Sequence, residues 1–352
     1  MSDRYARQSV LSEIGSSGQA ALARGRVLCI GAGGLGCAAL PYLAGAGVGR
    51  ITVIDHDRVE RANLHRQVLF TEADLGRPKA EVAAHRLSRL NPDIEIRPRA
   101  ERLHAGNVEA LFGEHDVIID GSDNFATKYL AGDASVKFSP PLVYGSATGL
   151  EAMVTTFRPG SGPCLRCLFP GPPGGWVPNC AEAGVLGPLV GAAGCMQATE
   201  AIKLLGGGAG LEPLVGHLWI LDGRDGSVRR LSLKTRPDCP TCSGARGDIV
   251  LSGPRDDIRE IGPEGLRAED FDAIVDVREL AEFEQGHIPG AENRPLSALQ
   301  AGRMELPEVG RCLVYCESGN RSRQAIEADA GGCGRELINL CGGIRAWRGD
   351  EP

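Results

Sequence analysis

The stretch Gly31–Gln67, GAGGLGCAALPYLAGAGVGRITVIDHDRVERANLHRQ, decides the fold of the first part of the chain. The strand-like run RVLCI (26–30) leads into glycines spaced GxGxxG, and the small residues Cys37 to Ala46 predict a helix whose N-terminus points at these glycines. Free backbone N–H groups and the helix dipole make such a turn an anion site. The next predicted strand ends at a carboxylate that can bind ribose hydroxyls. The sequence therefore predicts a nucleotide site formed by Gly31, Gly33, Gly34, Gly36 and Asp55.

The residues after this turn indicate which nucleotide chemistry to expect. GxGxxG alone favours a nicotinamide or flavin dehydrogenase. A dehydrogenase needs no cluster of Arg, Lys and Asp around its phosphates, whereas attack on a nucleoside triphosphate needs cations and a carboxylate for magnesium. Lys79 opens a predicted helix that Pro92 stops, and DVIIDGSDN places Asp120 and Asp123 at the end of another strand. Triphosphate chemistry is favoured, with phosphate and magnesium ligands among Asn63, Arg66, Lys79 and Asp123.

Together these motifs resemble the adenylation domain of the ubiquitin-activating-like superfamily, specifically the bacterial enzymes that activate small sulfur-carrier proteins for molybdopterin or thiamin synthesis. The opening RYARQSVLSEIG resembles that family's N-terminal motif, whose arginine, here Arg7, reaches into the active site of the partner subunit of a homodimer. The resemblance covers Arg4 to Cys242. The chain contains no GxxxxGK[ST], so it is not an ordinary P-loop ATPase.

Composition is consistent with a cytoplasmic α/β enzyme. The length of 352 residues suits two domains, and 42% hydrophobic residues with 49 glycines fit a packed core with tight turns. The net charge of −7 argues against a nucleic-acid partner. The Met-Ser-Asp-Arg start resembles no signal peptide, and the most apolar stretch, 183–205, is broken by Pro188 and carries charged residues, so no membrane association is expected.

Four of the twelve cysteines occur in the pairs CLRC and CPTC. Four thiolates are the tetrahedral set that zinc prefers in structural sites. The alternatives are two unrelated cysteine pairs or a thioredoxin-like redox site. The family that the chain resembles carries the same two pairs. The resemblance therefore implies a zinc ion on Cys164, Cys167, Cys239 and Cys242.

The segment FPGPPGGWVPNCAEAGVLGP (169–188) lies between the two cysteine pairs, which are called knuckles below. It is too rich in Pro and Gly for a helix or a central strand. We expect a surface loop that presents Cys180 for nucleophilic or disulfide chemistry. The alternative is that Cys180 packs at the start of the next helix. The family that the chain resembles has a functional loop cysteine at this place. Cys29, Cys37 and Cys195, in contrast, lie in apolar stretches and are expected in the core.

A second α/β pattern begins after a polar, Gly- and Pro-containing stretch. We expect a Rossmann-like, doubly wound adenylation domain over residues 1–246, a linker over 247–257 and a second, small α/β domain over 258–352. In the second domain, AIVDVR (273–278), CLVYC (312–316) and ELINL (336–340) predict strands. RELAEFEQGH and RSRQAIEADA predict helices.

The chemistry of this second domain is expected in CESGNRS. Backbone amides, a helix N-terminus and the guanidiniums of Arg321 and Arg323 all favour a reactive thiolate at Cys316. A cysteine phosphatase has a similar layout but places five residues between cysteine and arginine, and only four occur here. With DVR, GHIPGAENRP and NLCGGIRAW, the segment resembles a rhodanese, a sulfurtransferase that carries a cysteine persulfide. Its persulfide loop is Cys316, Glu317, Ser318, Gly319, Asn320, Arg321 and Ser322.

Glu317 departs from the basic or polar residue often found at its position, which leaves the sulfur donor open between a cysteine desulfurase and thiosulfate. Asp276 and His287 are expected to fix turns rather than to act in catalysis. The other expectation for Cys316, a buried strand-end cysteine without chemistry, does not account for the Arg-rich loop after it.

The two resemblances imply one reaction sequence. ATP and magnesium activate the C-terminal glycine of a small ubiquitin-like carrier ending in Gly-Gly. The persulfide on Cys316 then attacks the acyl-adenylate, Cys180 resolves the product, and a carrier thiocarboxylate leaves. Arg7, Arg66 and Lys79 are expected on the phosphates and Asp123 on magnesium. An NAD-binding oxidoreductase and a non-catalytic scaffold that keeps both folds are the alternatives.

Overall fold

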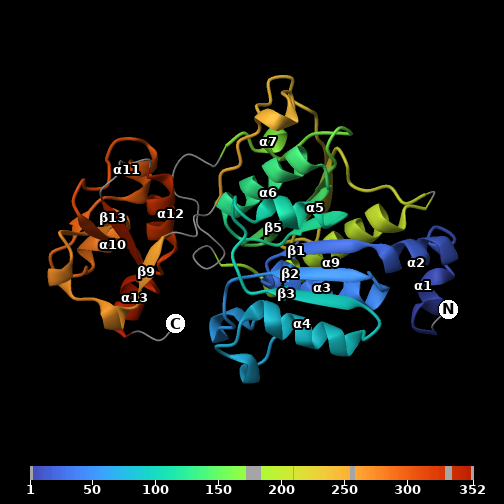
Figure 1. Ribbon diagram of the computed structural model, residues 1–352, viewed down its shortest axis with the longest axis horizontal. Coiled ribbons are helices and arrows are strands. Elements are labelled where there is room, and N and C mark those ends of the chain that lie inside the picture. Colours follow the sequence, from blue (N-terminus) through green and yellow to red (C-terminus); the bar gives the residue numbers. More distant parts are fainter. Residues whose placement is uncertain (1–2, 172–183, 209, 254–257, 330–334, 350–352) are drawn as a thin grey trace. The chain divides into compact units, whose positions relative to one another are not determined.

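The computed structural model describes residues 3–171, 184–208, 210–253, 258–329 and 335–349. These residues form two compact units, the first ending at Gly253 and the second beginning at Ile258. Each unit has its own sheet and its own hydrophobic clusters. Figure 1 shows the helices and strands of both, coloured along the sequence.

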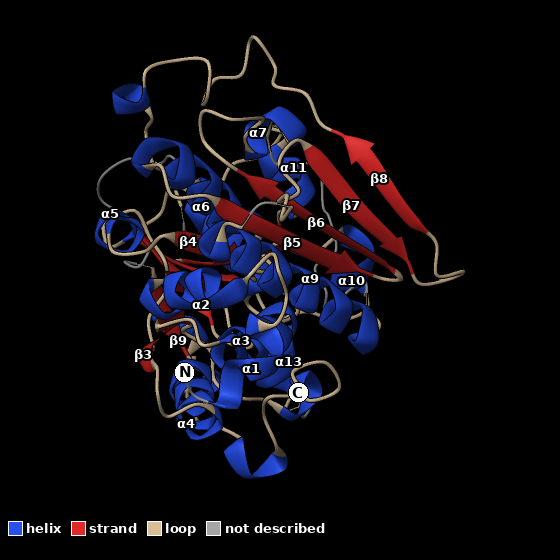
Figure 2. Ribbon diagram, turned by 90° about the vertical axis from the view of Figure 1, so that its right-hand side faces the viewer, coloured by secondary structure: helices blue, strands red, loops and turns tan. Residues whose placement is uncertain are grey.

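The first unit is built on an eight-stranded sheet of order β3-β2-β1-β4-β5-β6-β7-β8. Neighbours from β3 to β5 pair in parallel, whereas β6, β7 and β8 extend the sheet in antiparallel fashion, as Figure 2 shows. The strands are β1 (Arg26–Ile30), β2 (Arg50–Ile54), β3 (Glu95–Arg99), β4 (Val117–Asp120), β5 (Leu142–Thr148), β6 (Glu151–Phe157), β7 (His217–Asp222) and β8 (Val228–Ser232).

Helices cover both faces of this sheet. Along β1, Val27 and Cys29 pack into the cluster that includes α3, α4 and α9, while Leu28 and Ile30 pack with α5 and α6. A strand buried on both faces is apolar throughout, which is why RVLCI shows no alternation. The helices are α1 (Ala6–Ser9), α2 (Gly15–Arg24), α3 (Gly34–Ala46), α4 (Lys79–Leu90), α5 (Val108–Gly113), α6 (Phe125–Phe138), α7 (Leu165–Leu168) and α9 (Gly187–Gly206), with short 3₁₀ turns at Asp3–Tyr5, Arg61–Asn63, Glu72–Asp74 and Arg246–Asp248.

The predicted parallel α/β architecture is confirmed, with shifts at the ends of elements. The strand 26–30 and the strand ending beside Asp55 are present, but the helix after the turn begins at Gly34 and not at Cys37. Gly33 adopts the extended conformation of an N-cap, so the helix takes in the remaining glycines. Cys29 and Cys37 are buried as expected, whereas Cys195 is only half-buried.

The second unit is a five-stranded parallel sheet of order β11-β10-β12-β13-β9. Successive residues of β12 point into separate clusters, Cys312 and Val314 into one and Leu313 and Tyr315 into the other. The elements are β9 (Arg259–Ile261), β10 (Ala273–Asp276), α10 (Leu280–Glu284), β11 (Glu292–Asn293), α11 (Leu296–Gln300), β12 (Arg311–Tyr315), α12 (Asn320–Ala328), β13 (Glu336–Leu340) and α13 (Gly343–Arg348), with 3₁₀ turns at Pro263–Gly265 and Ala268–Asp270.

The three predicted strands of this unit are its central strands. The sequence pattern missed the edge strands β9 and β11, because segments of two or three residues are too short to show a period. No helix in the described parts of either unit is long and apolar enough to cross a membrane.

Candidate nucleotide, metal and persulfide sites

The glycine turn lies where β1 ends and α3 begins. Gly31 has φ +91°, a conformation that favours glycine, and a Cβ on Gly36 would lie 2.1 Å from the Gly31 carbonyl oxygen. The turn is therefore closed tightly onto the first turn of α3, and only glycine fits at Gly36. The N-terminus of a 13-residue helix thus faces the C-terminal edge of the sheet, where open α/β folds bind ligands.

Asp55 directly follows β2 and contacts the glycine turn. Its carboxylate accepts hydrogen bonds from the backbone N–H groups of Ala32 (2.7 Å) and Asp57 (2.8 Å). Burial and then the charge of Asp57 raise the pKa of the Asp55 carboxyl to about 6. An acceptor at the end of β2 is therefore held beside the turn by two backbone donors.

Lys79, at the first position of α4, is buried and lies 2.9 Å from a carboxylate oxygen of Asp57. Burial lowers the pKa of the Lys79 ammonium, but Asp57, Asp55 and Asp123 together outweigh burial and raise it. Lys79 is thus a buried, charged ammonium that three carboxylates surround. Sequence reasoning named Lys79, but it missed Asp57, whose only signal was a position two residues after Asp55.

The segment Asn63–Gln67 packs against the other side of the turn. A Cβ on Gly34 would lie 3.5 Å from Cγ of Arg66, and one on Gly33 would lie 3.9 Å from the amide nitrogen of Gln67. The Asn63 side-chain oxygen accepts hydrogen bonds from Arg66 (3.0 Å) and Gln67 (3.2 Å). The guanidinium of Arg66 is therefore oriented by Asn63 next to the first turn of α3.

The loop after β4 closes the site from the third side. A Cβ on Gly121 would lie 3.2 Å from the Gly31 carbonyl oxygen and 3.3 Å from the Gly36 nitrogen, so this loop touches the turn. Asp123 is exposed on the loop, and its charge reaches both Lys79 and Lys128. The structure therefore brings together the predicted glycines, Asp55, Lys79, Asn63 with Arg66, and Asp123.

A buried polar network beneath this loop was missed by sequence reasoning. Lys128 donates to a carboxylate oxygen of Asp120 (2.9 Å) and to the Gly145 carbonyl (2.8 Å). The Gln197 amide donates to the Asp120 carbonyl (2.7 Å) and the Val143 carbonyl (3.1 Å). The network joins the ends of β4 and β5 to α6 and α9 and fixes the backbone from which Asp123 projects.

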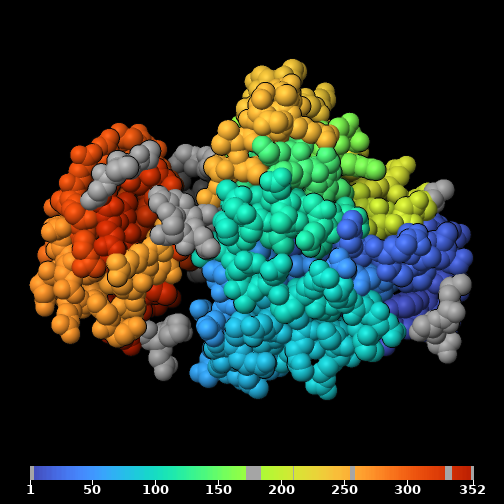
Figure 3. All heavy atoms as spheres, in the orientation of Figure 1, coloured from blue at the N-terminus to red at the C-terminus, as the bar shows by residue number. Residues whose placement is uncertain are grey.

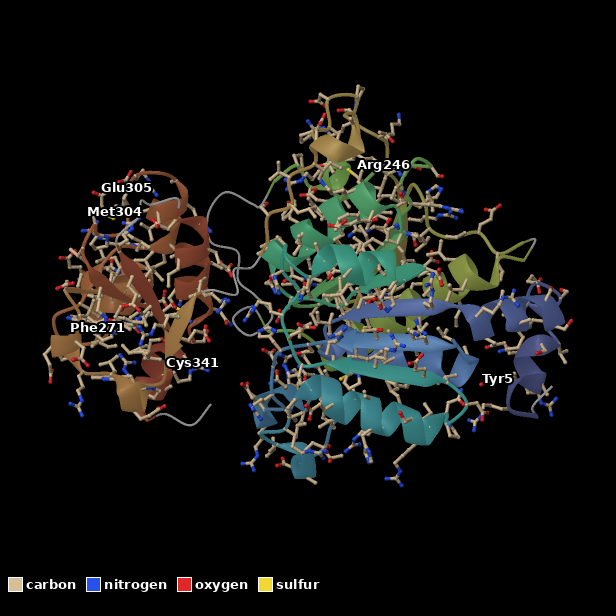
Figure 4. The ribbon with its side chains drawn as sticks, in the orientation of Figure 1. Tyr5, Arg246, Phe271, Met304, Glu305 and Cys341 are labelled. Atoms are coloured by element: carbon tan, nitrogen blue, oxygen red, sulfur yellow. The ribbon has the colours of Figure 1, made fainter. Side chains whose placement is uncertain are left out.

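Arg7 is exposed on α1, far from the turn of its own chain. The neighbouring Gln8 donates to the carbonyl of Ala46, the last residue of α3, while the turn lies at Gly34. A helix of this length spans about 20 Å. Tyr5, labelled in Figure 4, lies at the same end and accepts a hydrogen bond from Asn91.

The four cysteines of the two knuckles meet beside α6. Sγ distances are 3.8 Å for Cys164–Cys167, 3.5 Å for Cys164–Cys239 and 3.4 Å for Cys167–Cys242, and all four atoms lie within 4.8 Å of one another. Zinc–sulfur bonds of about 2.3 Å in a tetrahedron place sulfur atoms about 3.8 Å apart, so this cluster could bind zinc.

Hydrogen bonds around the cluster hold the two cysteine loops in place, which suits a metal site. The Arg236 backbone N–H donates to the Cys167 sulfur (3.4 Å), a contact typical of zinc knuckles. Arg166 and Thr241, one from each knuckle, both donate to the Asp133 carboxylate on α6. In Figure 3 the gold segment that contains the second knuckle lies on the green surface of the first unit. Cys180 lies outside the described residues, as does most of its loop.

In the second unit, the sulfur of Cys316 lies at the end of β12 and is fully buried. The Gly319 backbone N–H donates to this sulfur (3.1 Å), and the Ser322 hydroxyl lies 3.6 Å from it. Gly319 has φ +90° and caps α12, while a Cβ on Gly343 would lie 2.4 Å from the Cys316 carbonyl oxygen. The loop is thus a small cradle that curls around one sulfur atom.

The arginines of this loop bind carboxylates. Arg321 makes two hydrogen bonds of 2.7 Å to Glu282, and Arg323 binds Glu260 (2.8 Å) and Glu327 (3.2 Å). Asp276 is buried and holds Arg278 (2.7 Å), a structural role as expected. His287 stacks on Phe283 with ring centroids 3.9 Å apart.

The geometry defines a two-part enzyme: an α/β nucleotide-binding unit with a cysteine cluster, and a sulfurtransferase-like unit with a cysteine cradle. The ThiF family model matches residues 5–241, and the rhodanese-like domain model matches residues 264–350. The chain therefore belongs to the ThiF family and carries a C-terminal rhodanese-like domain. The dehydrogenase and scaffold alternatives are not favoured.

Relatives match either nearly the whole chain or about its first two thirds. The adenylyltransferase and sulfurtransferase MOCS3 of Anopheles gambiae is 39% identical over 98% of this chain and 86% of its own length. The sulfur carrier protein adenylyltransferase of Thermus thermophilus is 46% identical over 68% of this chain and 90% of its own length. The Escherichia coli MccB structure superposes with a TM-score of 0.61 at 22% identity, covering 69% of this chain and 74% of that one, which shows a shared fold.

Proposed function

We propose that this chain uses ATP to adenylate the C-terminal glycine of a small ubiquitin-like sulfur carrier and then converts that carboxylate into a thiocarboxylate. The names of the relatives support both half-reactions. One observation carries the proposal: a cation-and-carboxylate site at a glycine turn and a backbone cradle around a cysteine sulfur occur in one chain. Sulfur carriers for molybdopterin or thiamin synthesis are the substrates we propose.

The first half-reaction needs positioning and charge neutralisation. The carrier carboxylate attacks the α-phosphorus of ATP, pyrophosphate leaves, and a carrier acyl-adenylate forms. Amides at the start of α3, Arg66 and Lys79 neutralise phosphate oxygens, and Asp55 accepts from the ribose. Magnesium, which would be held by Asp123, neutralises further phosphate charge when bound.

Arg7 cannot serve the turn of its own chain, because it lies at the opposite end of α3. We therefore propose that it acts in the site of a partner subunit in a homodimer. We further propose a structural zinc on the four knuckle cysteines, domain limits at 1–246 and 258–352 with a linker between, and action in the cytoplasm.

The second half-reaction moves one sulfur atom. A persulfide on Cys316 attacks the acyl-adenylate carbonyl carbon, AMP leaves, and the carrier is joined to Cys316 through an acyl disulfide. The Cys180 thiolate attacks the Cys316 sulfur, which releases the carrier thiocarboxylate and leaves a Cys180–Cys316 disulfide. A thiol reductant then restores both thiols. The Gly319 amide stabilises the negative charge on Cys316 in this sequence.

Single substitutions separate the two half-reactions. Asp123→Ala should lower carrier-dependent ATP–pyrophosphate exchange by about 100-fold or more, because it removes the magnesium ligand, while leaving persulfide formation on Cys316 unchanged. Cys316→Ala should abolish persulfide formation and leave ATP–pyrophosphate exchange unchanged. Cys180→Ala should keep both partial reactions and lose multiple turnover unless a strong reductant is present.

The matched control is Asp93→Ala, an exposed carboxylate at the end of the unit where Arg4 lies. Exchange by Asp123→Ala at the wild-type rate would refute the adenylation site. Normal turnover of Cys180→Ala without reductant would remove that cysteine from the mechanism.

A further inference from the structure

Ion pairs flank the loop that follows Cys316, and they leave no excess of positive charge. Among the described residues, four guanidiniums bind carboxylates around the loop. The pairs are Arg321 with Glu282, Arg323 with Glu260 and Glu327, Arg278 with Asp276 and Glu317, and Arg345 with Glu317. A fifth guanidinium, that of Arg348, donates to the Gly286 carbonyl that Arg278 also binds, so five carboxylates face five guanidiniums and no positive charge is in excess.

Glu317 contributes the carboxylate nearest to the sulfur along the chain. It follows Cys316 directly, is partly exposed, and pairs with Arg278 (3.3 Å), which lies just after β10, and with Arg345 (3.7 Å) of α13. Arg278 is buried and already binds Asp276 at 2.7 Å, so its positive charge neutralises Glu317 only in part. Glu317 thus remains a negative group well within the Debye length of about 8 Å from any donor that reaches Cys316.

The sulfur donor must bring its outer sulfur atom to the Cys316 sulfur. Thiosulfate would arrive as a small dianion, and the negative charge of Glu317 would repel it. A persulfide on a cysteine arrives with a single negative charge on the sulfur that is transferred. The arrangement of charges therefore disfavours the first donor far more than the second.

We infer that Glu317 is a specificity-determining residue that excludes small dianionic sulfur donors and selects alkyl persulfides. The inference rests on the proposed sulfurtransferase activity. In the selected reaction the Cys316 thiolate attacks the outer sulfur of R–S–S⁻, forming Cys316–S–S⁻ and releasing R–S⁻. With thiosulfate the same attack would release sulfite, with atoms and charge equally balanced.

The test measures loading of Cys316 by mass spectrometry with three donors: thiosulfate, cysteine persulfide, and a cysteine desulfurase charged with persulfide. Glu317→Gln should raise kcat/KM for thiosulfate by roughly tenfold, and Glu317→Lys by up to roughly 100-fold. For cysteine persulfide the change should stay within about threefold. Comparing cysteine persulfide with the charged desulfurase distinguishes a small-molecule from a protein source.

Two further measurements make the result specific. Arg345→Gln removes a cation that partly neutralises Glu317, so it should lower kcat/KM for thiosulfate by about threefold. Added salt should speed thiosulfate loading of the wild type and have less effect on Glu317→Gln. Glu269→Gln, an exposed carboxylate of the same unit, is the matched control.

The inference is overturned if both Glu317 variants and Arg345→Gln load from thiosulfate within about twofold of the wild type. It is also overturned if all donors change in parallel. Absence of loading in every variant with every donor would instead refute the sulfurtransferase activity itself, with Cys316→Ala as the reference for no reaction.

Discussion

At the residue scale, the carboxylates next to the glycine turn act on one another. Burial and then the charge of Asp57 raise the pKa of Asp55, and Asp57 at the same time binds the ammonium of Lys79. Because the pKa of Asp55 in the folded protein exceeds its usual value, its ionisation costs stability. That cost is absent below pH of about 4, grows as pH rises toward 6, and stays constant above.

Nucleotide affinity should have the opposite dependence on pH. Only ionised Asp55 can accept from a ribose hydroxyl with both oxygens, so ATP affinity should fall by up to about tenfold per unit as pH drops below about 6. Asp57→Asn removes the repelling charge, so the fall should begin at a lower pH. Calorimetric titration of ATP from pH 5 to 8 measures both. Asp55→Asn is the reference for titration of ATP itself, and an unchanged midpoint in Asp57→Asn would contradict the assignment.

Sequence reasoning found residues whose chemistry is visible locally, such as Gly31 in its motif and Asp55 at a strand end. It did not find the partners of these residues. The guanidinium of Arg321 was expected to favour the Cys316 thiolate, but it binds Glu282, which comes from another helix, 39 residues earlier. The pairing of Lys128 with Asp120 likewise depends on how α6 lies against β4. Such contacts are tertiary, and a single sequence does not encode them in any short pattern.

At the element scale, the predicted elements are β1, β2, β4, α3 and α4 of the first unit and β10, β12, β13, α10 and α12 of the second, because their runs are long enough to show a pattern. Strand β5 and helices α2, α5 and α6 were not predicted. Nor were the exact ends of the predicted elements. The start of α3 moved to Gly34 because two glycines, Gly34 and Gly36, although poor helix formers, are held helical by packing against α9 and the turn. Edge strand β11 is defined only by its pairing with β10.

The cysteine knuckles join elements and should determine the stability of the first unit. Four thiolates on zinc contribute on the order of 10 kcal/mol of apparent binding energy, so Cys164→Ser or Cys239→Ser should lose the metal and melt at a lower temperature. Elemental analysis and thermal denaturation measure the two effects. Cys195→Ser, half-buried in α9 and outside the cluster, should keep the metal. Well-folded wild-type protein without zinc would contradict the expectation.

At the scale of the whole molecule, the position of Arg7 predicts shared active sites. Arg7→Ala and Arg66→Ala should each abolish pyrophosphate exchange. Co-expressed with separate tags, the two variants form mixed dimers in which one site has a wild-type Arg66 and receives Arg7 from the other chain. Such a population should recover about a quarter of wild-type activity. If Arg7 acted within its own chain, no mixture would recover any.

The cysteine cluster also bears on how the chain folds. One knuckle follows β6 and the other follows β8, so a metal bound to all four sulfurs would close the intervening segment, with α9, β7 and β8, into a ring. Closing a loop of this length costs a few kcal/mol of chain entropy, which the ring would already have lost before folding begins. The pairing of β6, which directly precedes the ring, with β7 inside it would then form within a restricted space. Metal binding before the sheet assembles would therefore speed this pairing of two strands that lie far apart in sequence.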